Sequence, residues 1–173
     1  MNPAPGLDLS FSSTDADWWL RRAADGFRVC SVALWTGGYE NNSGLSAVAE
    51  DNLRFARQAG FLTSGYLNAA PPDWWEDETA IEEAKKNAGA EWGKVPVMIV
   101  DWEIAGTTVD RVLSLAAALE AQEKKVAVYT AKYVWDRLGQ PDIAKLGRWP
   151  VWLAQFDGNP DLLTARGFGP WHH

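Results

Sequence analysis

Short apolar, β-rich runs alternate with amphipathic segments of helical period along most of this chain. No hairpin turn joins two neighbouring runs, so each connection can cross over and bring the next strand in parallel. Repeated strand–helix units of this kind build parallel sheets covered by helices. The expected strands cover residues 6–10, 28–34, 61–67, 95–102, 125–130 and 151–156, and the expected helices cover 14–24, 46–59, 79–92, 108–123 and 131–138.

A barrel of alternating strands and helices fits this pattern best. No strand is followed by a phosphate-binding glycine motif such as GxGxxG, which disfavours a nucleotide-binding sheet. Complete barrels of this class take about 250 residues, whereas this chain has 173. We therefore predict an α/β fold, a reduced TIM-like barrel of parallel strands without its final strand, in one domain spanning 1–173. The same shortness also fits a piece of a longer protein.

Composition narrows the kinds of partner. The formal net charge of −7 repels phosphate backbones, so no nucleic-acid partner is expected. No apolar run approaches the roughly 20 residues needed to cross a bilayer, and no basic segment with an apolar core opens the chain, so neither a membrane partner nor a signal peptide is expected. The 11 Trp among 173 residues exceed what core packing demands, and their flat apolar faces suit stacking against sugar rings.

The strongest candidate for a catalytic site is Asp101-Trp102-Glu103, at the end of the apolar run over 95–102. Side chains alternate along a strand, so Asp101 and Glu103 share one face while Trp102 faces the helices as core. Catalytic groups of a barrel lie at the carboxyl ends of its strands. The two acidic Cα atoms lie roughly 6.5–7 Å apart at a rise of about 3.3 Å per residue. Carboxyl groups so placed can flank a glycosidic bond, and their repulsion raises the pKa of one of them. An ion-paired or loop-capping acid pair is the structural alternative.

A third acid, Asp8, stands alone between Leu7 and Leu9 on the first expected strand. Because side chains alternate, Asp8 faces away from both leucines and into the same barrel interior as the acid pair. An aspartate that caps a turn or a helix is the alternative.

Five short motifs occur in an order and spacing that resemble glycoside hydrolase family 25, the muramidase-type lysozymes of bacteria and phages. They are Gly6-Leu7-Asp8-Leu9-Ser10, Gly65-Tyr66, Val100-Asp101-Trp102-Glu103, Val128-Tyr129-Thr130 and Trp152-Leu153-Ala154-Gln155-Phe156. The last strand that this family usually carries, with a further site aspartate, has no counterpart after Phe156.

The resemblance implies a peptidoglycan hydrolase, an N-acetylmuramidase that cleaves the β-1,4 bond from N-acetylmuramic acid to N-acetylglucosamine. It implies Glu103 as the acid that protonates the leaving oxygen, and Asp101 as the group that stabilises developing positive charge on an oxazolinium or an oxocarbenium ion. Asp8 matches an acid that orients water or Glu103. Inward-facing positions that hydrogen-bond the sugar match Tyr66, Tyr129 and Gln155.

Trp35 is the candidate stacking platform, chosen only for its place in the loop expected after the second strand. Glycosidases of this kind need no metal and no cofactor, and His172-His173 is expected to be a tail. We expect a monomer that acts on the bacterial cell wall, outside the cell or delivered by a phage.

Two alternatives remain open. A family 18 chitinase-like hydrolase also ends its fourth strand in DxE, but its signature has a further Asp where this chain has Ile99. A barrel that binds cell-wall glycan without cutting it, such as a phage virion or attachment component, is favoured by the missing final strand.

Overall fold

The computed structural model describes residues 6–37, 43–71, 73–137 and 144–154. Within them, six parallel strands form one sheet whose order follows the chain from β1 to β6. The strands are β1 (Gly6–Leu9), β2 (Val29–Trp35), β3 (Leu62–Asn68), β4 (Val97–Asp101), β5 (Lys125–Ala131) and β6 (Val151–Ala154). The helices are α1 (Ala16–Ala24), α2 (Ser43–Gln58), α3 (Asp77–Ala88), α4 (Val109–Glu120) and α5 (Lys132–Arg137), with 3-10 turns η1 (Gly89–Lys94) and η2 (Ala144–Arg148).

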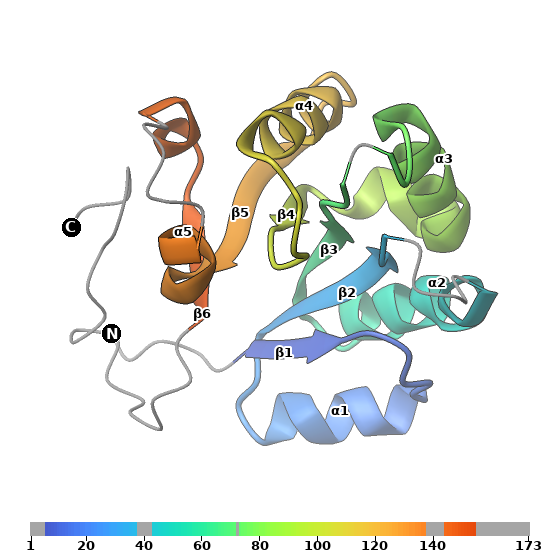
Figure 1. Ribbon diagram of the computed structural model, residues 1–173. Helices are drawn as coiled ribbons and strands as arrows, with labels where there is room; N and C mark the ends of the chain where they lie inside the picture. Colours follow the sequence, from blue (N-terminus) through green and yellow to red (C-terminus); the bar gives the residue numbers. More distant parts are fainter. Residues whose placement is uncertain (1–5, 38–42, 72, 138–143, 155–173) are drawn as a thin grey trace.

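The sheet curls into half of a barrel, with helices α1 to α4 on its outer face and β1 and β6 as its two edges (Figure 1). The predicted reduced barrel of parallel strands is therefore confirmed. Strands β1 to β4 are each followed by one of these helices, which crosses over on the outside so that the next strand can run parallel. All carboxyl ends of the strands consequently meet at one rim of the curled sheet.

The strand register sets which side chains meet at that rim. Asp8 on β1 lies opposite Ser31 on β2. Asp101, the last residue of β4, lies opposite Asn68 on β3 and Tyr129 on β5. Polar side chains from neighbouring strands are thus brought to one level of the sheet.

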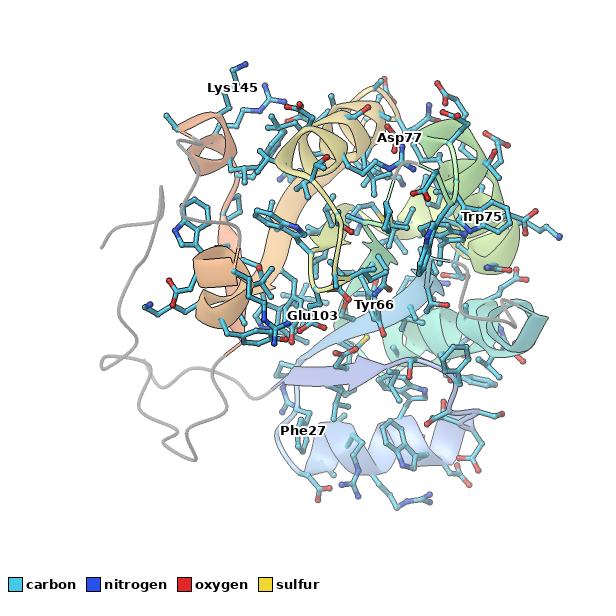
Figure 2. The ribbon with its side chains drawn as sticks, viewed as in Figure 1. Phe27, Tyr66, Trp75, Asp77, Glu103 and Lys145 are labelled. Atoms are coloured by element: carbon cyan, nitrogen blue, oxygen red, sulfur yellow. The ribbon has the colours of Figure 1, made fainter. Side chains whose placement is uncertain are left out.

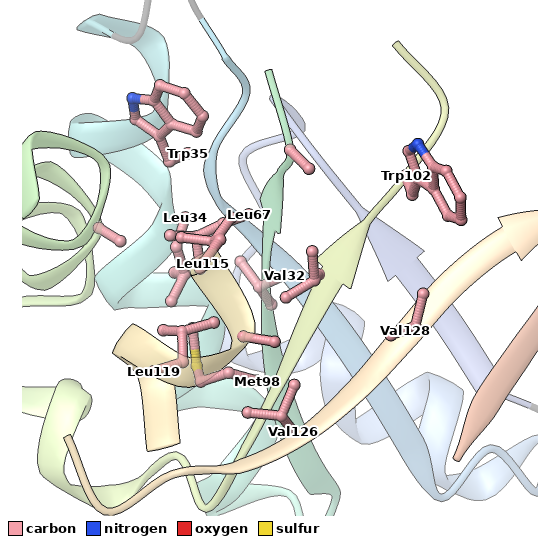
Figure 3. Packing of buried hydrophobic residues seen from close by; sticks show 14 of the residues in the cluster. Val32, Leu34, Trp35, Leu67, Met98, Trp102, Leu115, Leu119, Val126 and Val128 are labelled. Atoms are coloured by element: carbon pink, nitrogen blue, oxygen red, sulfur yellow. The ribbon is translucent and has the colours of Figure 1, made fainter. Parts of the chain in front are cut away.

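The core lies between the outer face of the sheet and the helices (Figure 3). Leu34, Leu67 and Met98 from the strands meet Leu115 and Leu119 from α4, and all five are buried. These apolar side chains alternate with the inward-facing polar ones, as a strand requires.

Trp102 belongs to this outer core, as its place between two acids predicts. Its ring is fully buried and meets Trp135 of α5 edge to face, with 6.4 Å between ring centroids. Its indole N–H donates to the carbonyl of Thr107 at 3.3 Å.

A buried ion pair holds the loop after β3 against two helices. Arg111 of α4 and Asp77 of α3 pair at 2.7 Å and are both nearly inaccessible. The guanidinium also donates to the carbonyls of Ala70, at 3.2 Å, and Trp75. This clamp fixes the loop that leaves the rim beside Asn68.

Several element boundaries differ from the sequence-based expectation, and two of these differences bear on the packing and the site. The helix expected over 79–92 is α-helical only to Ala88, because Gly89 adopts a φ of 51° and the chain continues as η1. A side chain at Gly89 would collide with the Glu50 carboxylate. Strand β2 runs on through Trp35, which moves that residue out of the expected loop.

Gly65→Ala is expected to destabilise the fold. A Cβ at this position would lie 3.0 Å from Leu34 Cγ, closer still to Leu34 Cδ1, and 3.1 Å from Met98 Sδ. Both neighbours are buried, so overpacking should lower the free energy of unfolding by about 1–3 kcal/mol. Chemical denaturation measures the change. Gly93→Ala is the control, because a Cβ there meets nothing within 4 Å, and equal stability losses in the two variants would contradict the argument.

Candidate active site

A pocket of about 260 Å³ opens on the concave side of the sheet, at the rim formed by the strand ends. Its lining comes from strands β1 to β6 and the segments that follow them. The lining residues are Asp8, Phe11, Ser31, Thr36, Tyr66, Asn68, Ile99, Asp101, Glu103, Tyr129 and Trp152. Figure 2 shows Tyr66 and Glu103 in the middle of the curled sheet, with α5 beside Glu103.

Three carboxyl groups line this pocket. Asp101 ends β4 and is only 7% exposed, Glu103 follows two residues later and is half-buried, and Asp8 on β1 is still reached by solvent. The backbone beyond β4 stays in the ladder, since the Ala69 N–H donates to the Asp101 carbonyl at 2.7 Å and the Trp102 N–H donates to the Tyr129 carbonyl at 2.8 Å. The position of Asp101 is therefore fixed from both sides.

Burial raises the pKa of all three acids. The pKa of Asp101 rises to about 8, first because the carboxyl is desolvated and then because Glu103 and Asp8 lie nearby. Desolvation also raises the pKa of Glu103, against a hydrogen bond from Tyr133, and the charge of Asp8 adds to the rise. Asp101 therefore holds its proton at neutral pH.

The pKa of Asp8 is raised too, because the pocket walls displace water around it. Hydrogen bonds from the Tyr66 hydroxyl and the Leu9 N–H oppose that rise. Tyr66 in turn accepts from the Ser10 hydroxyl, and burial with the charges of Asp8 and Asp101 raises the pKa of its phenol. Tyr66 therefore stays a neutral donor.

Tyr129 forms the opposite wall. Its phenol is also held neutral, because desolvation and the three nearby carboxylates raise its pKa. Its ring packs edge to face against Trp152 of β6, with centroids 5.7 Å apart. Tyr129 can therefore offer a hydroxyl to a ligand while Trp152, 40% exposed, offers a ring face.

The buried oxygens Ser31 Oγ, Asn68 Oδ1 and Asp101 Oδ1 have no hydrogen-bond partner in the described part of the protein. All three residues line the pocket. Buried polar atoms normally have partners, so unpaired oxygens here are positions for donors of a ligand or of water. Ser31 and Asn68 were not among the predicted site residues, although their alternation with buried apolar neighbours on β2 and β3 was the available signal.

The expectation that Trp35 is an exposed stacking platform is wrong. Trp35 is the last residue of β2 and is fully buried, and its ring contacts Trp75 edge to face at 6.0 Å on the helix side of the sheet. The exposed aromatic rings at the pocket are instead Phe11 and Trp152. Gln155 lies outside the described residues.

No group of three His, Cys, Asp or Glu side chains within the described ranges is arranged to hold a metal ion. None of the helices in those ranges combines the length and apolar character needed to cross a membrane.

Comparison with known proteins identifies the fold. No protein-family model matches the sequence, and no curated protein matches it. Among solved structures, the muramidase from Acremonium alcalophilum has a TM-score of 0.72 at 18% identity, over 98% of this chain and 83% of that one. A glycosyl hydrolase 25 of Streptococcus pneumoniae has a TM-score of 0.69 at 15% identity, over 94% and 73%.

A chitinase from Chromobacterium violaceum has a lower TM-score, 0.50, at 17% identity over 91% of this chain and 57% of that one. This chain therefore has the fold of the muramidase and of the glycosyl hydrolase 25, the family that its motifs resemble.

Asp101→Asn is expected to change how stability depends on pH. The folded-state pKa of about 8 lies above the 3.8 of an aspartate in an unfolded chain, so between these values the folded protein keeps a proton that the unfolded chain has released. The free energy of unfolding should therefore fall as pH rises from about 4 to about 8. Asparagine removes this loss, so the variant should be more stable than the wild type at pH 8 by more than about 2 kcal/mol.

Denaturant unfolding from pH 4 to pH 9 measures the effect. Asp73→Asn is the control, since Asp73 is exposed and away from the pocket. Parallel stability curves for the wild type and Asp101→Asn would contradict the buried, protonated state of Asp101.

Proposed function

We propose that this protein is a peptidoglycan hydrolase, an N-acetylmuramidase that cleaves the β-1,4 bond between N-acetylmuramic acid and N-acetylglucosamine. The observation that carries the proposal is the convergence of Asp8, Asp101 and Glu103 on one pocket at the strand ends of a muramidase-like half-barrel. The chain acts as one catalytic domain and as a monomer, and its place of action is the cell wall.

Glu103 is the general acid in this proposal. Its raised pKa favours the protonated form that a general acid needs. Glu103 gives this proton to the glycosidic oxygen as the bond to the sugar C1 breaks. Positive charge then develops at C1, or on an oxazolinium if the acetamido oxygen of the substrate attacks C1. Water adds to C1 and returns a proton to the Glu103 carboxylate, which restores the enzyme.

Asp101 stabilises that positive charge. It rests protonated, because burial and two neighbouring acids raise its pKa. A positive charge developing nearby lowers the pKa of Asp101, which releases its proton to water in the pocket and stabilises that charge as a carboxylate. Asp101 takes a proton back from water once the positive charge is gone. Asp8, held by Tyr66, orients the water or Glu103.

The remaining lining suits a saccharide. Tyr66 and Tyr129 offer hydroxyl groups, and the unpaired oxygens of Ser31 and Asn68 accept from sugar hydroxyls or an amide N–H. The exposed rings of Phe11 and Trp152 offer apolar faces to the C–H side of sugar rings. Binding should rest on these contacts, since a chain of net charge −7 is not attracted to anionic wall polymers.

Glu103→Gln is expected to lower hydrolysis at least about 100-fold, because the amide cannot donate the proton. The assay is digestion of purified sacculi with mass identification of the products, in which the wild type should release fragments with reducing ends on muramic acid. Glu82→Gln is the control, an exposed glutamate on α3 that pairs with Lys85 at the surface.

Full activity of Glu103→Gln would remove this residue from the mechanism. A wild-type protein that binds sacculi and releases no products would be a glycan-binding barrel instead. Products from chitin but not from sacculi would place it with the chitinases.

Phe11→Ala and Trp152→Ala are each expected to raise KM by about 3–10-fold with little change in kcat, because a stacking contact of about 1 kcal/mol is lost. Steady-state kinetics on soluble glycan fragments separates the two constants. Trp74→Ala is the matched control, since Trp74 is similarly exposed, at 47%, but does not line the pocket. An equal rise in KM for Trp74→Ala would contradict a stacking role.

A further inference from the structure

Helix α5 packs directly against the segment that carries Glu103. Trp135 of α5 meets the buried ring of Trp102, the residue just before Glu103. Val134 and Arg137 line a second, smaller cavity together with Glu103. One short helix therefore lies directly beside the acid.

Tyr133 of the same helix reaches the acid itself. Its hydroxyl donates a hydrogen bond to the Glu103 carboxylate. The ring remains 46% exposed, and the Arg137 guanidinium lies over it, 5.2 Å from the centroid. The ring is thus supported from its own helix while its hydroxyl bonds to Glu103.

Glu103 needs such a partner because the strand does not fix it. Strand β4 ends at Asp101, and the ladder hydrogen bonds end at the Trp102 N–H. A glutamate two residues beyond a strand has three side-chain torsions to fix, and an acid catalyst must hold one orientation toward the bond it cleaves.

We propose that Tyr133 is the positioning residue for Glu103, whose carboxyl group it orients from α5. This inference rests on the proposed function of Glu103 as the acid. The phenol acts through Glu103, since Tyr133 is not among the residues that line the pocket.

The charges around Glu103 show why this hydrogen bond matters. From the sheet side it faces Asp8, Asp101 and Tyr129, and from α5 it faces Tyr133 and Arg137. Burial and Asp8 favour the protonated form, and the hydrogen bond from Tyr133 favours the ionised form. The balance lets Glu103 both release its proton and take one back from water.

Tyr133→Phe removes the hydroxyl and keeps the ring that packs on α5. The pKa of Glu103 should then rise by about 0.5–1 unit, because a hydrogen bond to the charged form is lost. Carbon-13 NMR of carboxyl-labelled glutamate measures this pKa, with the resonance assigned by its absence in Glu103→Gln. The alkaline limb of the kcat profile should move to higher pH by the same amount, and the maximal kcat should fall by about 3–10-fold.

Lys132→Ala is the matched control on the same helix. It breaks the surface pair of Lys132 with Asp136 and leaves the phenol in place. The titration of Glu103 and the pH profile should then match those of the wild type.

Two results would overturn the inference. One is an unchanged Glu103 titration in Tyr133→Phe, and the other is an equal shift in Lys132→Ala, which would mean that the helix as a whole sets the pKa. A shifted titration in Tyr133→Phe, with no products from the wild type, would leave the hydrogen bond in place and overturn the proposed function instead.

Discussion

The site depends on the parallel ladder that holds β4 between β3 and β5. That ladder continues one residue past the strand, through the Asp101 carbonyl and the Trp102 N–H. It buries the Asp101 carboxyl at the rim while the next side chain, Trp102, anchors in the outer core. Because the backbone of Asp101 is fixed, its carboxyl group stays buried, and this burial raises its pKa.

The raised pKa values in the pocket arise because three carboxyl groups lie close together in a site with little access to water. Desolvation is the first cause of the raised pKa at Asp8, Asp101 and Glu103 alike. Two phenols oppose this rise, Tyr66 at Asp8 and Tyr133 at Glu103, and they come from different elements, β3 and α5. The three acids therefore titrate as a coupled group, and each neutral phenol tunes one member of it.

Much of the fold could be predicted from the sequence, because buried parallel strands are near-continuous apolar runs and their crossovers carry a helical period. The same period-two alternation brought Asp8, Asp101 and Glu103 to one face. The prediction for Trp35 was wrong because an aromatic residue at the end of an apolar run is compatible with either a strand or a loop. Only its packing against Trp75 shows that Trp35 belongs to the core. Tyr133 was missed because its contact with Glu103 is made between elements 30 residues apart in the sequence, which no local pattern encodes.

The clamp between Arg111 and Asp77 limits which loops of this domain can change in length. One guanidinium binds two carbonyls of the loop after β3 and a carboxylate of α3 at once. An insertion between Ala70 and Trp75 would pull those carbonyls apart and leave a buried cation without its acceptors, which is costly. Insertions and deletions are therefore better tolerated in the loops at the rim that are not bound by a buried charged side chain.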